Sequence, residues 1–268
     1  MSEAARHIAF VIEWLKRPDW GQYQYMEGSE IYTHRDDALI DLNCADGSAT
    51  GLATSPRAMN ARPRALDLFC GAGGASAGLY RAGFDVVGVD IKPQPRYPFS
   101  FRRADAMTFP LDGFDFLWAS PPCQRFCALN TREDLSHYPD LIEPVRARFI
   151  ASGKPFVIEN VPGAPVRCDV LLCGAMFGLR CYRHRHFECS FPVPAPRHPK
   201  HTVRVNRRGE NRREHWARGG FMTITGDVGV YCGLGAMGID WMSGAEMSEA
   251  IPPAYSEFIA RAWMTGRR

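Results

Sequence analysis

A cysteine on a stiff loop is the first feature of this sequence that could do chemistry. Cys123 lies in the sequence SPPCQ (120–124), directly after an apolar run. Two consecutive prolines fix φ and remove two backbone donors, so the loop presents the cysteine in one orientation. A thiolate held in this way can add to an electrophilic carbon, although an isolated cysteine is more often inert and buried.

A carboxyl group could support that cysteine. Glu159 begins the sequence ENVP (159–162), which follows the apolar run 156–158. Taken singly, Glu159 could be a helix cap. If both runs are parallel strands of one sheet, their carboxyl ends meet at one edge, and Glu159 then lies near Cys123. That pairing favours acid–base chemistry.

A glycine-rich turn is the third such feature. The sequence DLFCGAGG (67–74) closes the apolar run 65–69, and a second run ends in Asp90, nineteen residues after Gly71. Glycines there let the backbone approach a ligand, and an acid after the next strand suits ribose hydroxyls. Ser76 stands where the third glycine of a G-x-G-x-x-G fingerprint belongs, which disfavours a pyrophosphate cofactor. Asp105 follows a third expected strand and could accept a hydrogen bond from an adenine amino group, although a capping role is as plausible for it or for Asp90.

These residues need elements to position them, and the apolar pattern predicts strands alternating with helices. Such alternation is typical of an α/β fold with a doubly wound, mostly parallel sheet whose ligands lie at the carboxyl ends of the strands. The expected strands are 65–69, 84–89, 114–119 and 156–158, and the expected helices are 75–82, 141–150 and 253–264. The final helix should bury Tyr255, Phe258, Ile259 and Ala262 on one face.

Length and composition bound the protein further. With 268 residues, 46% of them hydrophobic and 23% charged, the chain is expected to form one large globular domain, preceded by an extension of unknown function over 1–62 that ends in a linker. No apolar run approaches the roughly 18 residues of a membrane helix, and nothing resembles a signal peptide. We therefore expect no membrane association and a cytoplasmic location.

The nine cysteines are an odd number, which argues against a disulfide framework. The spacing of Cys168, Cys173, Cys181 and Cys189 lacks the C-x2-C pattern that structural zinc usually requires. Buried free thiols and no metal are the expectation.

Charge is distributed unevenly along the chain. Residues 1–62 carry 6 Lys and Arg against 9 Asp and Glu, and the remainder carries 26 against 20. Between Arg197 and Arg218 there are eight basic residues against only Glu210 and Glu214. This stretch is either a solvated loop or a surface for a polyanion.

In order and rough spacing, DLFCGAGG, PPCQ, ENV and RHRHFE resemble the motifs of the cytosine-5 DNA methyltransferases of bacteria and their phages. The resemblance runs from about Arg64 to the end, because MGIDWM (237–242) and AIPPAY (250–255) are similar to the closing motifs of that family. It implies a Rossmann-like methyltransferase domain over 63–268, with a short, irregular target-recognition region over 190–236. The sequence departs from the family at Cys181-Tyr182, where a glutamine is common, and at Ser248-Glu249, where Gly-Asn is common.

The resemblance also implies roles for single residues. Cys123 would attack C6 of a flipped-out cytosine, and Glu159 would hold N3 and the exocyclic amine. Of Arg183 and Arg185, the second is favoured for contact with the cytosine carbonyl oxygen. S-adenosyl-L-methionine would be bound by residues of the glycine loop and of the strand ends, namely Phe69, Gly71, Gly73, Gly74, Asp90, Ile91, Asp105, Ala106 and Pro122.

The implied partner is double-stranded DNA. A monomer is the default expectation, and a partner restriction nuclease is compatible with the sequence. Three alternatives stay open: a transfer-RNA cytosine-5 methyltransferase that shares the PPC and ENV motifs, a catalytically inactive DNA-binding relative, and an NAD-dependent oxidoreductase suggested only by the glycine loop and Asp90.

Overall fold

The computed structural model describes residues 62–126, 138–225, 229 and 232–267. The expected extension over 1–62 therefore lies almost wholly outside the described residues. Among the residues that are described, no helix is both long and apolar enough to cross a membrane.

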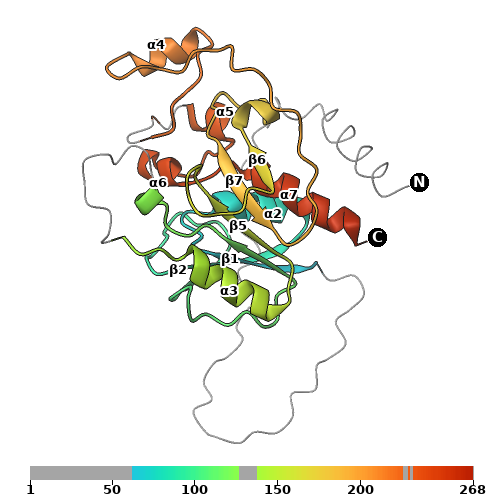
Figure 1. The fold of residues 1–268 in the computed structure, drawn as a ribbon. Helices are drawn as coiled ribbons and strands as arrows, with labels where there is room; N and C mark the ends of the chain where they lie inside the picture. The colour runs from blue at the N-terminus through green and yellow to red at the C-terminus, as the bar shows by residue number, and fades with distance from the viewer. Residues whose placement is uncertain (1–61, 127–137, 226–228, 230–231, 268) are drawn as a thin grey trace, which may run out of the picture. The chain divides into compact units, whose positions relative to one another are not determined.

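The core of the fold is a seven-stranded sheet of the described residues, in the order β3-β2-β1-β4-β5-β7-β6 (Figure 1). Five strands pair in parallel, and β7 runs antiparallel between β5 and β6. The expected α/β fold with a mostly parallel sheet is thus confirmed. The strands are β1 (Arg64–Leu68), β2 (Asp85–Asp90), β3 (Ser100–Arg103), β4 (Phe116–Ala119), β5 (Phe156–Asn160), β6 (Val170–Leu172) and β7 (Arg185–Cys189).

Two strands were not expected from the sequence, and one expected strand ends early. β6 is an apolar run of only three residues, VLL, and β7 carries the charged sequence RHFEC, so neither has the longer apolar run that signals a strand. β1 stops at Leu68 because Phe69 adopts the left-handed conformation, with φ of 59°.

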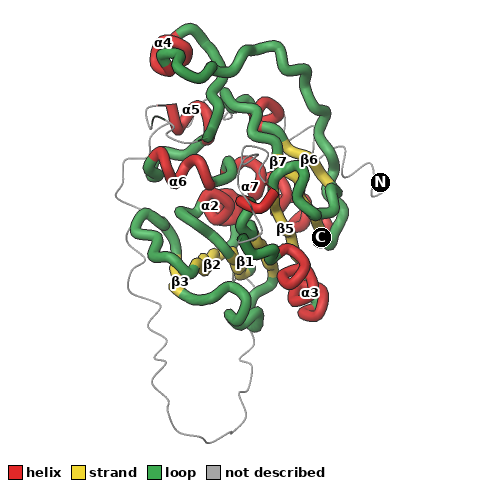
Figure 2. The backbone as a smooth tube through the Cα atoms, turned by 60° about the vertical axis from the view of Figure 1, so that its left-hand side comes forward, coloured by secondary structure: helices red, strands yellow, loops and turns green. Residues whose placement is uncertain are grey.

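Helices flank the sheet on both faces, and a long loop follows β7 along the chain (Figure 2). The expected helices correspond to α2 (Gly74–Ala82), α3 (Ile142–Ser152) and α7 (Pro253–Gly266), while α4 (Arg212–Ala217), α5 (Gly233–Met237) and α6 (Gly244–Glu249) are short. All four residues expected on the buried face of α7 are buried. Ile150, expected on the apolar stripe of α3, is instead 62% exposed, because the buried stripe is formed by Ile142, Val145 and Phe149.

Strand alternation decides which side chains reach each face. Leu66, Leu117 and Ile158 share one hydrophobic cluster with the apolar stripe of α3. Their neighbours along the strands, including Asp67 and Glu159, therefore point to the opposite face, where α2 and α7 pack. Both carboxyl groups are thus buried on the face that carries the glycine loop.

The contact between α2 and α7 is close enough to require glycine. A Cβ on Gly78 would lie 2.0 Å from the carbonyl oxygen of Pro253 and 2.1 Å from Oγ of Ser256. We expect Gly78→Ala to lower the free energy of unfolding by about 3 kcal/mol, because the two helices must separate. Urea denaturation measures this cost. Gly266→Ala on α7, where a Cβ would meet no atom within 4 Å, should be neutral or slightly stabilising and serves as its control.

Candidate active site

The site lies where the strand order reverses. β1 is hydrogen-bonded to β2 on one side and to β4 on the other, so the loops after β1 and β4 leave the sheet side by side. In a parallel sheet this crevice is the usual position for a ligand. The glycine loop follows β1, and the Cys123 loop follows β4.

Left-handed backbone conformations shape the glycine loop. Gly71 and Gly73 have φ of 48° and 91°, and Phe69 shares this region of φ. Asp90, at the end of β2, accepts a hydrogen bond from the backbone N–H of Gly71 at 3.1 Å. The carboxylate predicted for a ribose therefore also fixes the loop that would face the same ligand.

The closing motif supports this loop from the other end of the chain. Trp241 donates its indole N–H to the carbonyl oxygen of Ala72 at 2.8 Å, and Ser256 of α7 donates to that of Ala75 at the same distance. Sequence reasoning missed both residues. Trp241 lies within the closing motif MGIDWM, but no pattern in the sequence indicates that it contacts a loop 169 residues away.

A buried acid lies beneath the glycine loop. Asp67 on β1 is fully buried and accepts a hydrogen bond from Ser76 Oγ at 2.5 Å, and Ser76 Oγ lies 2.7 Å from the hydroxyl of Tyr97. The second carboxyl oxygen of Asp67 has no hydrogen-bond partner. Burial raises the pKa of Asp67 to about 7. The only feature of the sequence that marks Asp67 is that it is an acidic residue inside an apolar strand.

This raised pKa predicts a pH-dependent stability. The folded protein binds the Asp67 proton more tightly than the unfolded chain does, so the stabilisation is complete below about pH 4 and is lost as the pH rises through 7. We expect about 2 to 3 kcal/mol of stability to disappear between pH 5 and pH 8 in the wild type. Asp67→Asn should remove this part of the dependence, whereas exposed Asp112→Asn should retain it. Urea denaturation at both pH values makes the comparison, and equal slopes in wild type and Asp67→Asn would refute the assignment.

The Cys123 loop is tied directly to β5. Asn160, the last residue of β5, donates its side-chain amide to the carbonyl oxygen of Pro121 at 3.0 Å. Cys123 is half-buried, packs against the apolar cluster under α3 and accepts a backbone hydrogen bond from Phe126 at 2.9 Å. The predicted convergence of the PPC and ENV segments at one sheet edge is therefore observed, and Asn160 is the residue that joins them.

Glu159 forms the polar centre of the site. Arg185, at the start of β7, donates from Nε to Glu159 Oε1 at 2.9 Å, and both side chains are mostly buried. Burial raises the pKa of Glu159, although Arg185, Ser120 and Arg183 act in the opposite direction. A carboxyl group with a raised pKa keeps its proton to a higher pH than an exposed carboxyl group does.

The two arginines of the RHR sequence have different environments. Arg183 donates to the carbonyl oxygens of Ile224, Ser248 and Ala250, each at 2.7 Å. Burial lowers the pKa of Arg183 to about 9, which still leaves the guanidinium charged at pH 7. Arg183 thus joins the recognition region to the closing segment, and Arg185 is the one that contacts Glu159.

The remaining residues predicted for the cofactor surround the same crevice. Ile91 is 66% exposed, which is unusual for isoleucine and leaves an apolar surface beside Asp90. Pro122 is half-buried, and Ala106 is buried. The carboxylate of Asp105 accepts a hydrogen bond from the backbone N–H of Met107 at 2.8 Å, as a turn-capping acid does. The glycine loop, the exposed apolar surface of Ile91 and the carboxylates of Asp90 and Asp105 together fit a nucleoside ligand.

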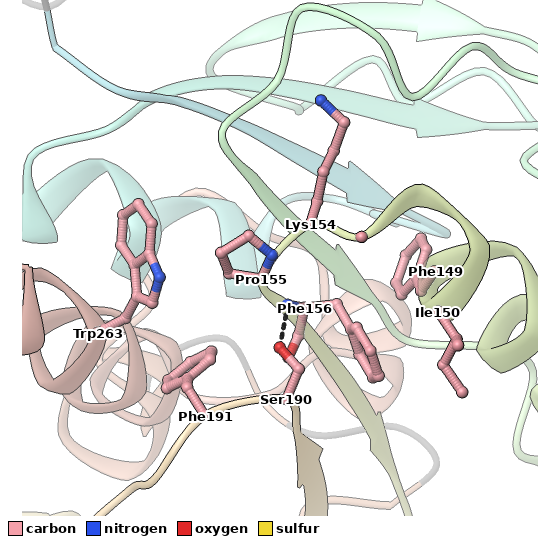
Figure 3. A pocket seen from close by; sticks show the side chains of 9 residues that line it. Phe149, Ile150, Lys154, Pro155, Phe156, Ser190, Phe191 and Trp263 are labelled. Carbon is pink, nitrogen blue, oxygen red and sulfur yellow. Dashed lines mark hydrogen bonds between the residues drawn. The ribbon is translucent and has the colours of Figure 1, made fainter.

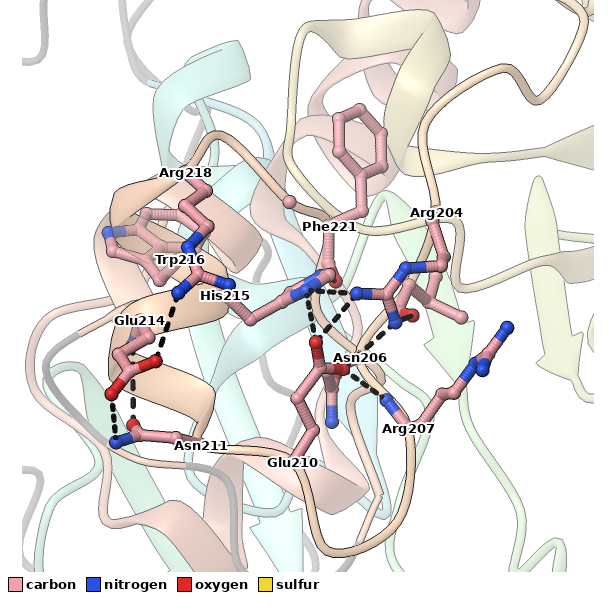
Figure 4. A network of polar contacts seen from close by, with 12 residues as sticks. Arg204, Asn206, Arg207, Glu210, Asn211, Glu214, His215, Trp216, Arg218 and Phe221 are labelled. Atoms are coloured by element: carbon pink, nitrogen blue, oxygen red, sulfur yellow. Dashed lines mark hydrogen bonds and ion pairs between the residues drawn. The ribbon is translucent and has the colours of Figure 1, made fainter.

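The basic stretch 197–218 is irregular apart from α4, and its two acids are already paired. Arg204 contacts Glu210 at 2.6 Å, and Arg218 contacts Glu214 at 3.1 Å (Figure 4). His215 lies buried beside Glu210, which anchors this network. Arg197, Lys200, Arg207 and Arg208 of the same stretch are also exposed.

A groove elsewhere on the molecule does not belong to this site. It lies at the amino end of β5, between Phe149, Lys154, Phe191 and Trp263 (Figure 3). The candidate site is at the carboxyl end of the same strand. The groove therefore cannot hold a ligand in contact with Glu159 or Cys123.

The comparisons agree with this geometry where they cover it. Residues 64–165 match the family model described as C-5 cytosine-specific DNA methylase, a range that includes the glycine loop, Cys123 and Glu159. Residues 64–165 are thus similar to C-5 cytosine-specific DNA methylases. No curated protein sequence matches the chain.

Three solved structures are similar to parts of this chain. A triple variant of DNMT2 from Spodoptera frugiperda is 20% identical with a TM-score of 0.37, covering 52% of this chain and 56% of that one. An Escherichia coli prophage-encoded DNA modification methyltransferase is 21% identical with a TM-score of 0.34, covering 47% and 45%. Dnmt2 of S. pombe is 17% identical with a TM-score of 0.34, covering 50% and 53%. The chain spans about half the length of these proteins.

Proposed function

We propose that this protein transfers a methyl group from S-adenosyl-L-methionine to C5 of a flipped-out cytosine in double-stranded DNA. The single observation that carries the proposal is the contact between the Cys123 loop and the end of β5. The hydrogen bond from Asn160 to Pro121 holds the loop that carries Cys123 against the end of β5, the strand on which Glu159 is paired with Arg185.

In the proposed reaction the thiolate of Cys123 adds to C6 of cytosine, which breaks the C5–C6 double bond and makes C5 nucleophilic. When bound, S-adenosyl-L-methionine would supply the methyl group: the C5–methyl bond would form as the methyl–sulfur bond of the sulfonium breaks, with the neutral thioether as the leaving group. A base then removes the C5 proton, the electrons of that C–H bond restore the double bond, and the thiolate leaves. Every bond formed to Cys123 is thus broken again, and the enzyme is regenerated.

Glu159 and Arg185 would stabilise the adduct. A protonated Glu159 can donate to N3 of the ring as negative charge develops there, and its raised pKa supports that state. The remaining donors of Arg185 could contact the cytosine carbonyl oxygen. The glycine loop, Asp90 and Ile91 would bind the nucleoside part of the methyl donor. The exposed Lys and Arg side chains of 197–218 would neutralise phosphates of the DNA.

Because a stacked cytosine is inaccessible, the substrate must be extruded from the duplex, at a cost of roughly a few kcal/mol that pocket contacts repay. Few recognition elements lie in 190–236, so we propose a short or loosely read target, recognised by a single chain.

Nucleoside mass spectrometry on unmethylated duplex DNA, treated with the protein and S-adenosyl-L-methionine, tests the proposal. We expect 5-methylcytosine, and bisulfite mapping of the same DNA would give the recognised site. Transfer RNA at equal concentration provides the competing substrate. Modification of the RNA alone would overturn the DNA assignment, and no modified cytosine in either substrate would overturn the activity.

A further inference from the structure

One cysteine and three histidines converge outside the candidate active site. They are Cys173, His184, His198 and His201, and their four ligand atoms all lie within 4.8 Å of one another. Sγ of Cys173 is 3.4 Å from Nε2 of His201, and Nε2 of His184 is 3.0 Å from Nε2 of His198. Cysteine and histidine are the ligands that zinc prefers in proteins.

The sheet brings the first two ligands together. β6 ends at Leu172 and β7 begins at Arg185, and these two residues are partners in the antiparallel register. The next pair outward is therefore Cys173 and His184, which face each other across the end of the ladder. The sequence spacing conceals this, because the loop between the two strands separates the ligands by eleven positions.

The other two ligands come from the loop that follows β7. His198 and His201 are three residues apart, and their rings lie 4.9 Å from each other. The ring of Tyr182 stacks on that of His201 at 3.6 Å, which holds this imidazole toward Cys173. Both histidines are exposed, whereas Cys173 is buried, so a metal would enter from the solvent side.

The distances fit a small tetrahedral ion. With Zn–N of about 2.1 Å and Zn–S of about 2.3 Å, tetrahedral geometry requires N–N separations of about 3.4 Å and S–N separations of about 3.6 Å. The nitrogen–nitrogen contact of 3.0 Å and the sulfur–nitrogen contact of 3.4 Å are slightly shorter than these values. The backbone N–H of Met176 donates to the carbonyl oxygen of Cys173 at 2.9 Å, which fixes the turn that carries this ligand.

We propose that Cys173, His184, His198 and His201 form a four-coordinate structural zinc site. Four protein ligands leave no open position, so the ion would have no catalytic role. It would fasten the beginning of the basic stretch 197–218 to the start of β7, next to the Arg185 that contacts Glu159. This inference does not depend on the proposed methyl transfer, and it replaces the expectation that Cys173 is merely a buried thiol.

The test uses the untagged full-length protein, stripped of metal by a chelator and then titrated with Zn²⁺ against a chromophoric competitor. We expect one equivalent of zinc per chain and a rise in Tm when it binds. Co²⁺ in place of zinc should give the intense visible bands of tetrahedral cobalt and a thiolate-to-cobalt charge-transfer band. If the protein binds no zinc, or if bound cobalt gives the spectrum of a six-coordinate ion, the proposal is wrong. The four side chains would then be a hydrogen-bonded cluster without a metal.

Two variants assign the ligands. Cys173→Ser should remove the charge-transfer band, and the exposed pair His198→Ala/His201→Ala should weaken zinc binding by at least ~100-fold without touching the core. The matched controls are exposed Cys168→Ser and His186→Gln on β7, which should bind zinc as the wild type does. If the histidine pair retains full affinity, or if Cys168→Ser loses the band, the ion is held elsewhere and the assignment is wrong.

Discussion

Replacement of Cys123 by alanine is expected to abolish methyl transfer, with a loss on the order of 10^4-fold or more. Without the thiolate, C6 of cytosine has no nucleophile, and C5 does not become electron-rich enough to take the methyl group. The fold should be unaffected, because Cys123 is only half-buried at the edge of its cluster. The measurement is incorporation of labelled methyl groups into duplex DNA.

The matched control is Cys168→Ser, which changes an exposed thiol remote from the Pro121–Asn160 contact. It should retain full activity. Cys123→Ala should also still bind duplex DNA, because the phosphate contacts that we propose come from the basic stretch 197–218. Methyl transfer by Cys123→Ala within tenfold of the wild type would exclude the covalent mechanism.

Replacement of Glu159 by glutamine is expected to lower kcat by roughly 10^2 to 10^4-fold. Glutamine keeps the size of the side chain but cannot share a proton with N3 of the ring. Because burial raises the pKa of Glu159, the wild-type rate should fall as the pH rises through that pKa and the carboxyl loses its proton. Glu159→Gln should lose this alkaline limb. Single-turnover rates across pH 6 to 9 test both statements.

Glu188→Gln separates chemistry from stability. Glu188 lies on β7 opposite Ile158, points to the α3 face and binds Arg146 through both carboxyl oxygens, at 2.8 and 2.7 Å. Loss of that charge leaves Arg146 without its buried partner and should cost about 3 kcal/mol of stability, with kcat unchanged below the Tm.

A pH profile of Glu159→Gln that matches the wild type would contradict a proton-sharing role for Glu159.

The sequence alone determined the chemistry-bearing residues and the fold class. Cys123, Glu159 and the glycine loop each follow an apolar run, and in a parallel sheet the ends of such runs meet at one edge. Local pattern is sufficient for this, since the period of apolar residues and the position of prolines and glycines are properties of the chain itself. The predicted strands and the final helix were confirmed for the same reason.

Only the tertiary structure decided how these residues are held. Asn160 joins the Cys123 loop to the end of β5, Trp241 supports the glycine loop, and Arg183 contacts three carbonyl oxygens rather than Glu159. The register of β6 and β7 brings Cys173 opposite His184. These contacts join residues far apart in the chain, and their partners are mostly backbone atoms, which every residue carries. A sequence therefore contains no local signal for them, and the packing of the folded sheet selects them.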